Sequence, residues 1–244
     1  MDISEIKRVD DEKLITVERL RKYEKYKLVL EQNKTGTKRK ITEKTDSSKK
    51  AKLIDEGVYK KDPSVLDTVG VVIADSHGRV VSATSSGGIF LKQDGRLGQS
   101  CMFGCGCYSE QKDNGVSVTA VSTGLGEQLM RTMLPMKTCE AVSSWSIDDE
   151  ESFHEKFQTF LNANFMNSAF LSGDLYKSFG ILCLRRELIQ PNRVSIDLLF
   201  GHSTPSLCFA YLSSNDDMPQ TVMSRKANET TKFVIGSMGT VFNL

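Results

Sequence analysis

Apolar and polar positions divide the chain into a weakly patterned N-terminal part and a strongly patterned remainder. Residues 18–32, ERLRKYEKYKLVLEQ, contain neither Gly nor Pro and predict a helix over about 15–33. Its apolar residues form only a loose stripe, so this helix needs a partner surface to be stable. Residues 34–63 are rich in charged, Ser and Thr residues and poor in aromatic ones, which predicts a disordered linker.

A folded domain is predicted from Asp67 onward. Residues 69–74 form a near-continuous apolar run, typical of a strand buried between two layers. A turn at 76–78 and a second run beginning at Val80 complete a predicted hairpin. Residues 115–124, GVSVTAVSTG, indicate a further strand that ends in a glycine-containing turn.

The rest of this domain alternates between helical and strand patterns. Helical spacing is present over 126–144 and 150–171. Strands are then expected at 179–185, 194–200, 206–212 and 232–241. The order β-β-β-α-α-β-β-β-β predicts an α+β fold in which helices cover a sheet.

Composition narrows the class of protein. The 244 residues are 39% hydrophobic and 26% charged, and no run of 18 apolar residues or apolar N-terminal signal occurs, so neither a membrane span nor secretion is expected. Six cysteines without such a signal indicate a reducing compartment. The net charge of +1 hides an asymmetry, because residues 1–67 carry 18 basic against 14 acidic residues and residues 68–244 carry 14 against 17.

Most common catalytic motifs are missing. Cys105 and Cys107 form a C-x-C with Cys101 nearby, but a zinc site normally needs four ligands and the three histidines are widely separated. A glycine-rich turn between strands is the better interpretation, so no metal is expected. The chain has no GxSxG motif, no marked cysteine nucleophile and no phosphate-binding glycine loop, and therefore no predicted cofactor.

The N-terminal part carries two basic clusters separated by eight residues, with the spacing of a bipartite nuclear-localisation signal. A merely solvated charged linker or a non-specific nucleic-acid patch would have the same composition. No aromatic residue lies between the clusters, which argues against direct nucleic-acid binding. We therefore expect a nuclear import receptor as partner and a nuclear location. The residues concerned are Lys38, Arg39, Lys40, Lys49, Lys50 and Lys52.

Thr68 occupies the junction between the predicted linker and the first strand. A cut between Asp67 and Thr68 would leave this threonine with a free α-amine, whose reference pKa is about 8. Such an amine can act as general base for the hydroxyl of the same residue. A threonine at the start of a strand is by itself weak support for this chemistry.

Three segments, which follow one another along the chain, make the indication of a threonine nucleophile specific: DTVGVVIADSHGRVVSATSSGG, GRLGQSCMFGCGCY and STGLGE. Together they resemble threonine aspartase (taspase), in the type-2 asparaginase branch of the N-terminal-nucleophile hydrolases. The resemblance covers residues 64–244. Residues 15–63 resemble the end of that enzyme's α-part, the segment that precedes the nucleophile. It implies a four-layer αββα fold, self-cleavage between Asp67 and Thr68, and division into 1–67 and 68–244.

The resemblance also implies roles for individual residues. Thr68 is the expected nucleophile, Ser86 the hydroxyl that faces it, and Thr123 with Gly124 the lining of the oxyanion hole. Arg96 matches the arginine that binds a carboxylate. Without the resemblance, Ser86 and Thr123 would be ordinary turn residues and Arg96 a surface residue after a turn.

Gln99 departs from the asparaginase pattern, in which an Asp at this position holds the substrate's free α-amino cation. An endopeptidase meets a neutral peptide N–H there, and a buried unpaired carboxylate would be costly. Gln99 therefore predicts cleavage after an internal Asp. The resemblance implies substrates with acidic sites, of the trithorax (mixed-lineage-leukaemia) and general transcription factor IIA type, and an α/β heterodimer or (αβ)2 assembly without membrane association.

The N-terminal strand and HAGAG-type turn of the family's α-part have no counterpart before Thr68. We therefore expect the fold to lack the N-terminal part of the α-subunit and this chain alone to be poorly active or inactive. Two alternatives to a nuclear threonine endopeptidase stay open. One is a truncated, non-catalytic taspase-like chain that binds a partner, and the other is an asparaginase-type amidohydrolase.

Overall fold

The computed structural model describes residues 68–89, 92–228 and 230–243, together with seven residues near the N-terminus. These seven are helical and all lie within the predicted N-terminal helix: Val17, Leu20, Arg21, Tyr23, Glu24, Lys27 and Leu28. The predicted linker, the basic clusters and Asp67 lie outside the described residues. The chain divides into two compact units, Met1–Val65 with Ile89–Arg96, and Leu66–Gly88 with Leu97–Leu244.

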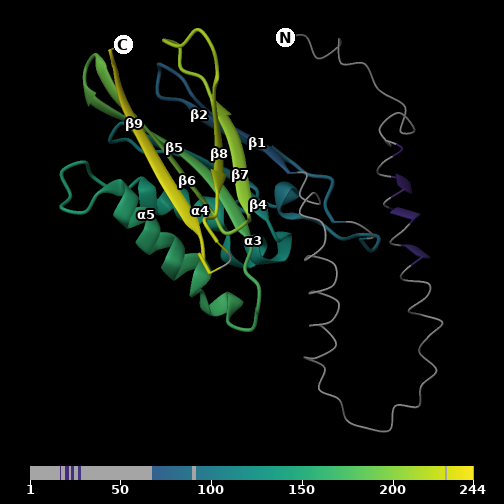
Figure 1. Cartoon of the computed structure of the whole chain (residues 1–244). Helices are drawn as coiled ribbons and strands as arrows, with labels where there is room; N and C mark the ends of the chain where they lie inside the picture. Colours follow the sequence, from purple (N-terminus) through teal and green to yellow (C-terminus); the bar gives the residue numbers. More distant parts are fainter. Residues whose placement is uncertain are drawn as a thin grey trace. The chain divides into compact units, whose positions relative to one another are not determined.

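An antiparallel five-stranded sheet forms the centre of the second unit (Figure 1). Its strand order is β3-β4-β5-β6-β9. The strands are β3 (Cys107–Gln111), β4 (Val116–Gly124), β5 (Phe179–Gln190), β6 (Arg193–His202) and β9 (Val234–Asn243). Two hairpins accompany this sheet: β1 (Val69–Ala74) with β2 (Val80–Ser85), and β7 (Ser206–Tyr211) with β8 (Gln220–Arg225).

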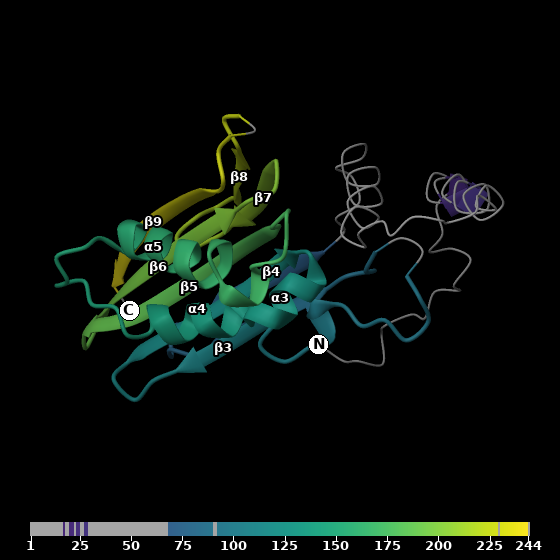
Figure 2. The same cartoon turned by 90° about the horizontal axis from the view of Figure 1, so that it is seen from below.

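Three helices cover one face of the sheet (Figure 2). They are α3 (Gly126–Thr132), α4 (Leu134–Val142) and α5 (Phe153–Leu161). Apolar side chains from alternate positions of β4 and β5, Phe179 among them, pack against these helices in the main core, which also holds Leu129 and Phe157. No helix among the described residues is long and apolar enough to cross a membrane.

The β1–β2 hairpin packs on the opposite face of the sheet. The Ser117 hydroxyl donates to the carbonyl of Gly78 at 2.7 Å. A Cβ at Gly70 would lie 3.1 Å from Val121, so the two layers are in direct contact there. The described residues thus form a mixed α/β fold with the predicted sheet and helices, while the fourth layer stays a prediction.

The outer face of this hairpin corrects one expectation. Strand β1 was predicted to be buried between two layers, yet Val69, Val71 and Ile73 are 66%, 46% and 51% exposed. Val81 on β2 is 55% exposed. An apolar run cannot distinguish a strand buried on two faces from one buried on a single face, because the pattern carries no information on the second neighbour.

Two helical predictions also need correction. The stretch 126–144 is not one helix, because Met133 adopts a left-handed conformation (φ 48°) that ends α3 and starts α4. Pro135 then lies in the first turn of α4, where a missing N–H costs least. The stretch 150–171 contains only α5, a π-helical turn over Asn162–Met166 and a 3-10 turn over Ala169–Leu171. Strands β3 and β8 are not predicted by the sequence.

His202 links the end of β6 to β8. Its Nδ1 lies 2.8 Å from the carbonyl oxygen of Thr204 and its Nε2 lies 2.8 Å from the Ser224 hydroxyl. The carbonyl can only accept, so the neutral ring carries its proton on Nδ1 and accepts from Ser224. Burial, aided by the charge of Lys226, lowers the pKa of His202 despite the bond to Thr204.

We predict that His202 makes stability fall in weakly acidic solution. The unfolded chain protonates this histidine near its ordinary pKa of about 6.5, whereas the folded chain resists protonation, so its stabilising contribution is lost as pH falls below that value. Chemical denaturation between pH 5 and 7.5 should give a steeper pH dependence of the unfolding free energy for wild type than for His202→Gln. Equal slopes would contradict the assignment.

Candidate functional site

Thr68, Ser86 and Gln99 meet at the N-terminal end of β1. The Thr68 hydroxyl donates to Ser86 Oγ at 3.2 Å, and Ser86 Oγ also accepts the backbone N–H of Gly88 at 3.1 Å. Gln99 Nε2 lies 3.5 Å from Thr68 Oγ1 and points its amide donor at that oxygen. Gln99 is only 4% exposed, so a neutral, buried side chain faces the predicted nucleophile.

The hairpin register explains why Thr68 and Ser86 are neighbours. Val69 pairs with Ser85, so the residues just beyond this pair, Thr68 and Ser86, lie side by side at the open end of the hairpin. The two residues are 18 positions apart in the sequence, and the single turn between β1 and β2 brings them together. Ser86 thus lies opposite Thr68, at the place that the family resemblance implies for it.

Gln99 reaches the site through a short 3-10 turn, Gln99–Cys101, which packs on Gly106. A Cβ at Gly106 would lie 2.6 Å from both the Cα of Ser100 and Thr84 Oγ1, and 2.8 Å from the carbonyl oxygen of Gln99. Only glycine permits so close an approach. Gly106 therefore allows the close packing that holds the Gln99 turn in place. The glycine-rich turn predicted around Cys105 and Cys107 is present, but the sequence pattern does not predict this role for Gly106.

Thr123 and Gly124 end β4 on the side where Thr68 lies. Along β4, Ser117 contacts Gly78 after the end of β1, and Val121 contacts Gly70 near its start. Strand β1 therefore runs antiparallel to β4. Thr68, just before β1, consequently lies toward Thr123, near the end of β4. Positions two apart on a strand share a face, so Thr123 faces the hairpin as Val121 does.

The backbone around Gly124 is closely packed. Gly124 has φ 137°, and a Cβ there would lie 2.4 Å from the carbonyl oxygen of Ser178. The next residue, Leu125, donates its N–H to the same Ser178 oxygen at 3.1 Å.

Arg96 belongs to the first compact unit, in the segment Ile89–Arg96. It follows a turn at Asp94 and Gly95, and its backbone N–H donates to the carbonyl of Gln93 at 3.1 Å. This is the turn expected from the Asp-Gly pair. Carboxylate binding by Arg96, like cleavage at Asp67, stays a prediction.

The cysteines and histidines form no alternative centre. Burial raises the pKa of the Cys139 and Cys183 thiols far above neutrality, so neither supplies a thiolate nucleophile. Among the described residues, no group of three His, Cys, Asp or Glu side chains is arranged to hold a metal ion. His202 is a buried structural residue, while His77 is an exposed turn residue beside Asp75.

The described residues thus combine a mixed α/β layer architecture with a threonine just before the first strand, a serine hydroxyl that faces it and a glycine at the end of β4. Residues 2–166 match the family described as asparaginase (Asparaginase_2). The match covers more than half of the chain, which therefore belongs to this family of N-terminal-nucleophile amidohydrolases and peptidases.

Three relatives illustrate the similarity. A probable isoaspartyl peptidase/L-asparaginase of Drosophila melanogaster is 42% identical over 88 residues, 36% of this chain and 25% of the relative. The isoaspartyl peptidase/L-asparaginase of Rattus norvegicus is 36% identical over 101 residues, 41% of this chain and 29% of the relative. The isoaspartyl peptidase of Escherichia coli is 41% identical over 68 residues, 28% and 20%. The chain thus spans about a quarter of the length of these curated relatives.

Gly124→Ala should destabilise the protein because the new methyl group would overlap the Ser178 carbonyl at a φ that L-residues avoid. We expect the unfolding free energy to fall by about 2 kcal/mol or more. Gly173→Ala is the matched control, since a Cβ at Gly173 has no neighbour within 4 Å. Denaturant titration of both variants checks this, and similar stabilities would show that the turn tolerates a side chain.

Proposed function

We propose that this chain forms part of a threonine endopeptidase that cleaves itself between Asp67 and Thr68 and then cuts target proteins after an internal Asp. The observation that carries the proposal is Gln99, a buried neutral amide directed at Thr68 Oγ1. Membership of the asparaginase family supports hydrolysis of an amide bond, and Gln99 supports the endopeptidase reading within that class.

The chemistry proposed for Thr68 needs no cofactor. Its free α-amine takes the hydroxyl proton as Oγ1 attacks the main-chain carbonyl carbon of the substrate Asp. The carbonyl oxygen gains negative charge in this step, and donors at Thr123 and Gly124 stabilise it. When the C–N bond breaks, the amine returns its proton to the leaving nitrogen. Water then hydrolyses the Thr68 ester and regenerates the free hydroxyl.

Ser86 and Gln99 position Thr68 for this attack. Ser86 Oγ accepts a hydrogen bond from the Thr68 hydroxyl, and it also accepts one from the backbone N–H of Gly88. The amide nitrogen of Gln99 directs its N–H donor toward Thr68 Oγ1. The lone pair used for attack is thereby oriented before a substrate binds.

Substrate preference follows from charge. A carboxylate at position 99 would attract a free α-amino cation, as proposed for the asparaginases, whereas the neutral Gln99 suits a peptide N–H. Arg96 is proposed to bind the side chain of the substrate Asp as a bidentate partner. The proposed targets are nuclear transcription regulators with acidic sites, and the two basic clusters, Lys38–Lys40 and Lys49–Lys52, would bring the protein to the nucleus through an import receptor.

An asparaginase-type amidohydrolase is the second candidate function. The observation in its favour is that the matched relatives of fly, rat and Escherichia coli are named isoaspartyl peptidases or L-asparaginases. In that case Thr68, Ser86, Thr123 and Gly124 would act in the same way on a small substrate with a free α-amine. The nature of residue 99 separates the two candidates. A truncated, non-catalytic chain that binds a partner is the third candidate, and it would show no Thr68-dependent cleavage.

Intact-mass analysis tests the nucleophile. Wild-type protein should convert, even if slowly, into residues 1–67 and 68–244. Thr68→Ala should stay intact because it has no hydroxyl, and Thr68→Ser should cleave. Thr221→Ala, which alters an exposed strand threonine, is the control and should behave as wild type. An intact wild-type chain under all conditions would favour the non-catalytic alternative.

Substrate competition tests position 99. Wild-type protein should hydrolyse an internal-Asp peptide faster than L-asparagine or an isoaspartyl dipeptide. Gln99→Asp should lower peptide cleavage at least about tenfold, because the carboxylate cannot donate to Thr68 and is costly to bury. Gln99→Asn is the matched control, because Asn is equal in size to Asp but neutral. This variant should lose less peptide cleavage than Gln99→Asp. A wild-type preference for L-asparagine would instead establish the amidohydrolase.

A further inference from the structure

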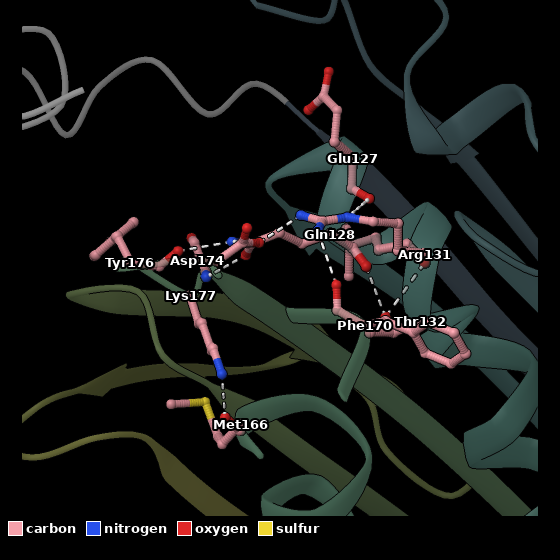
Figure 3. A network of polar contacts seen from close by, with 11 residues as sticks. Glu127, Gln128, Arg131, Thr132, Met166, Phe170, Asp174, Tyr176 and Lys177 are labelled. Carbon is pink, nitrogen blue, oxygen red and sulfur yellow. Dashed lines mark hydrogen bonds and ion pairs between the residues drawn. The ribbon is translucent and has the colours of Figure 1, made fainter. Parts of the chain in front are cut away.

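Gln128, in the first turns of α3, is a buried polar residue whose side chain is used entirely by backbone and carboxylate partners. It is 4% exposed. Its Nε2 donates to the carbonyl of Tyr176 at 2.7 Å and to Asp174 Oδ2 at 2.9 Å (Figure 3). Its Oε1 accepts the backbone N–H of Ser178 at 2.9 Å. A single amide thus connects α3 to three points of the segment that leads into β5.

The same segment is supported from the outside by Arg131. The Arg131 guanidinium pairs with Asp174 and donates to the carbonyl of Phe170 at 2.8 Å (Figure 3). Arg131 and Asp174 are partly exposed, so this ion pair is screened by solvent and contributes modestly to stability. The buried contacts of Gln128 are therefore the stronger constraint on residues 176–178.

Ser178 transmits this constraint to the end of β4. Its N–H is held by Gln128, and its carbonyl oxygen accepts the N–H of Leu125. That oxygen also occupies the space in which a Gly124 side chain would lie. The main chain of Ser178 is consequently bonded on both sides, and the Gly124–Leu125 backbone rests against it.

Thr132, a second buried polar residue of α3, shows that burial alone does not create such a connection. Its hydroxyl is fully buried but donates to the carbonyls of Gln128 and Leu129 within its own helix. Loss of that hydroxyl would destabilise α3 without releasing Ser178. The two residues therefore separate a general effect on stability from a specific effect on the turn.

We propose that Gln128 is a positioning residue that fixes the Thr123–Gly124 backbone through Ser178. Its catalytic consequence rests on the proposed function, in which these two residues stabilise the oxyanion. Donors in such a site must already be oriented when charge develops, because movement during the reaction would reduce their effect. Gln128 touches neither Thr68 nor the substrate and acts only through the backbone it holds.

Hydrogen exchange tests the structural part without requiring activity. Gln128→Met keeps the length of the side chain and removes its three hydrogen bonds. We expect the amide protons of Leu125 and Ser178 to exchange at least about tenfold faster than in Thr132→Val compared at equal global stability. Equal exchange at these two amides in both variants would overturn the proposal.

Self-cleavage and peptide hydrolysis test the catalytic part. Gln128→Met should lower kcat at least about tenfold with KM unchanged, since one poorly oriented oxyanion donor costs about that much or more. Thr132→Val should retain kcat within about twofold. Unchanged kcat in Gln128→Met overturns the catalytic role. If wild type itself shows no Thr68-dependent cleavage, the proposed function fails, while the exchange result still decides whether Gln128 holds the turn.

Discussion

The alternation of side chains along β4 is the constraint on which the rest of the structure depends. Its even-numbered residues enter the core beneath the helices, and its odd-numbered residues face the β1–β2 hairpin. One strand therefore holds both layers in register. Thr123 belongs to the second set, so the same alternation that builds the core directs this residue to the face where Thr68 lies. A one-residue slip would bury Thr123 under the helices.

The candidate site is assembled mainly by backbone packing. Gly106, directly before β3, lets its own backbone approach both the Gln99 turn and Thr84 of β2, and Gly124 lets β4 approach Ser178, each at distances that no side chain on these glycines permits. Such contacts are stiff because packed main-chain atoms cannot rotate away. The neutral Gln99 is compatible with its burial, whereas a buried carboxylate would require a cation as partner.

The sequence predicts strands where the pattern is strong and local. The strands Val69–Ala74 and Val116–Gly124 are predictable because β-branched residues are dense there. The facing of Thr68 and Ser86 comes from the family resemblance, because the hairpin pattern alone does not give its register. Strand β3, CYSEQ, is polar and short, and β8 carries only two apolar residues, so neither has a pattern distinguishable from a loop. Gln128 belongs to no motif, since its role arises from contacts 46 to 50 residues away.

The protein has both buried and exposed cysteine thiols, whose different reactivities report on opening of its core. Cys139 and Cys183 are completely inaccessible and held in the thiol form, while Cys101 and Cys208 are exposed. An alkylating reagent would therefore modify the exposed pair rapidly and the buried pair only when the helix layer separates from the sheet. The rate of the slow modification measures how often the layers that hold the candidate site come apart.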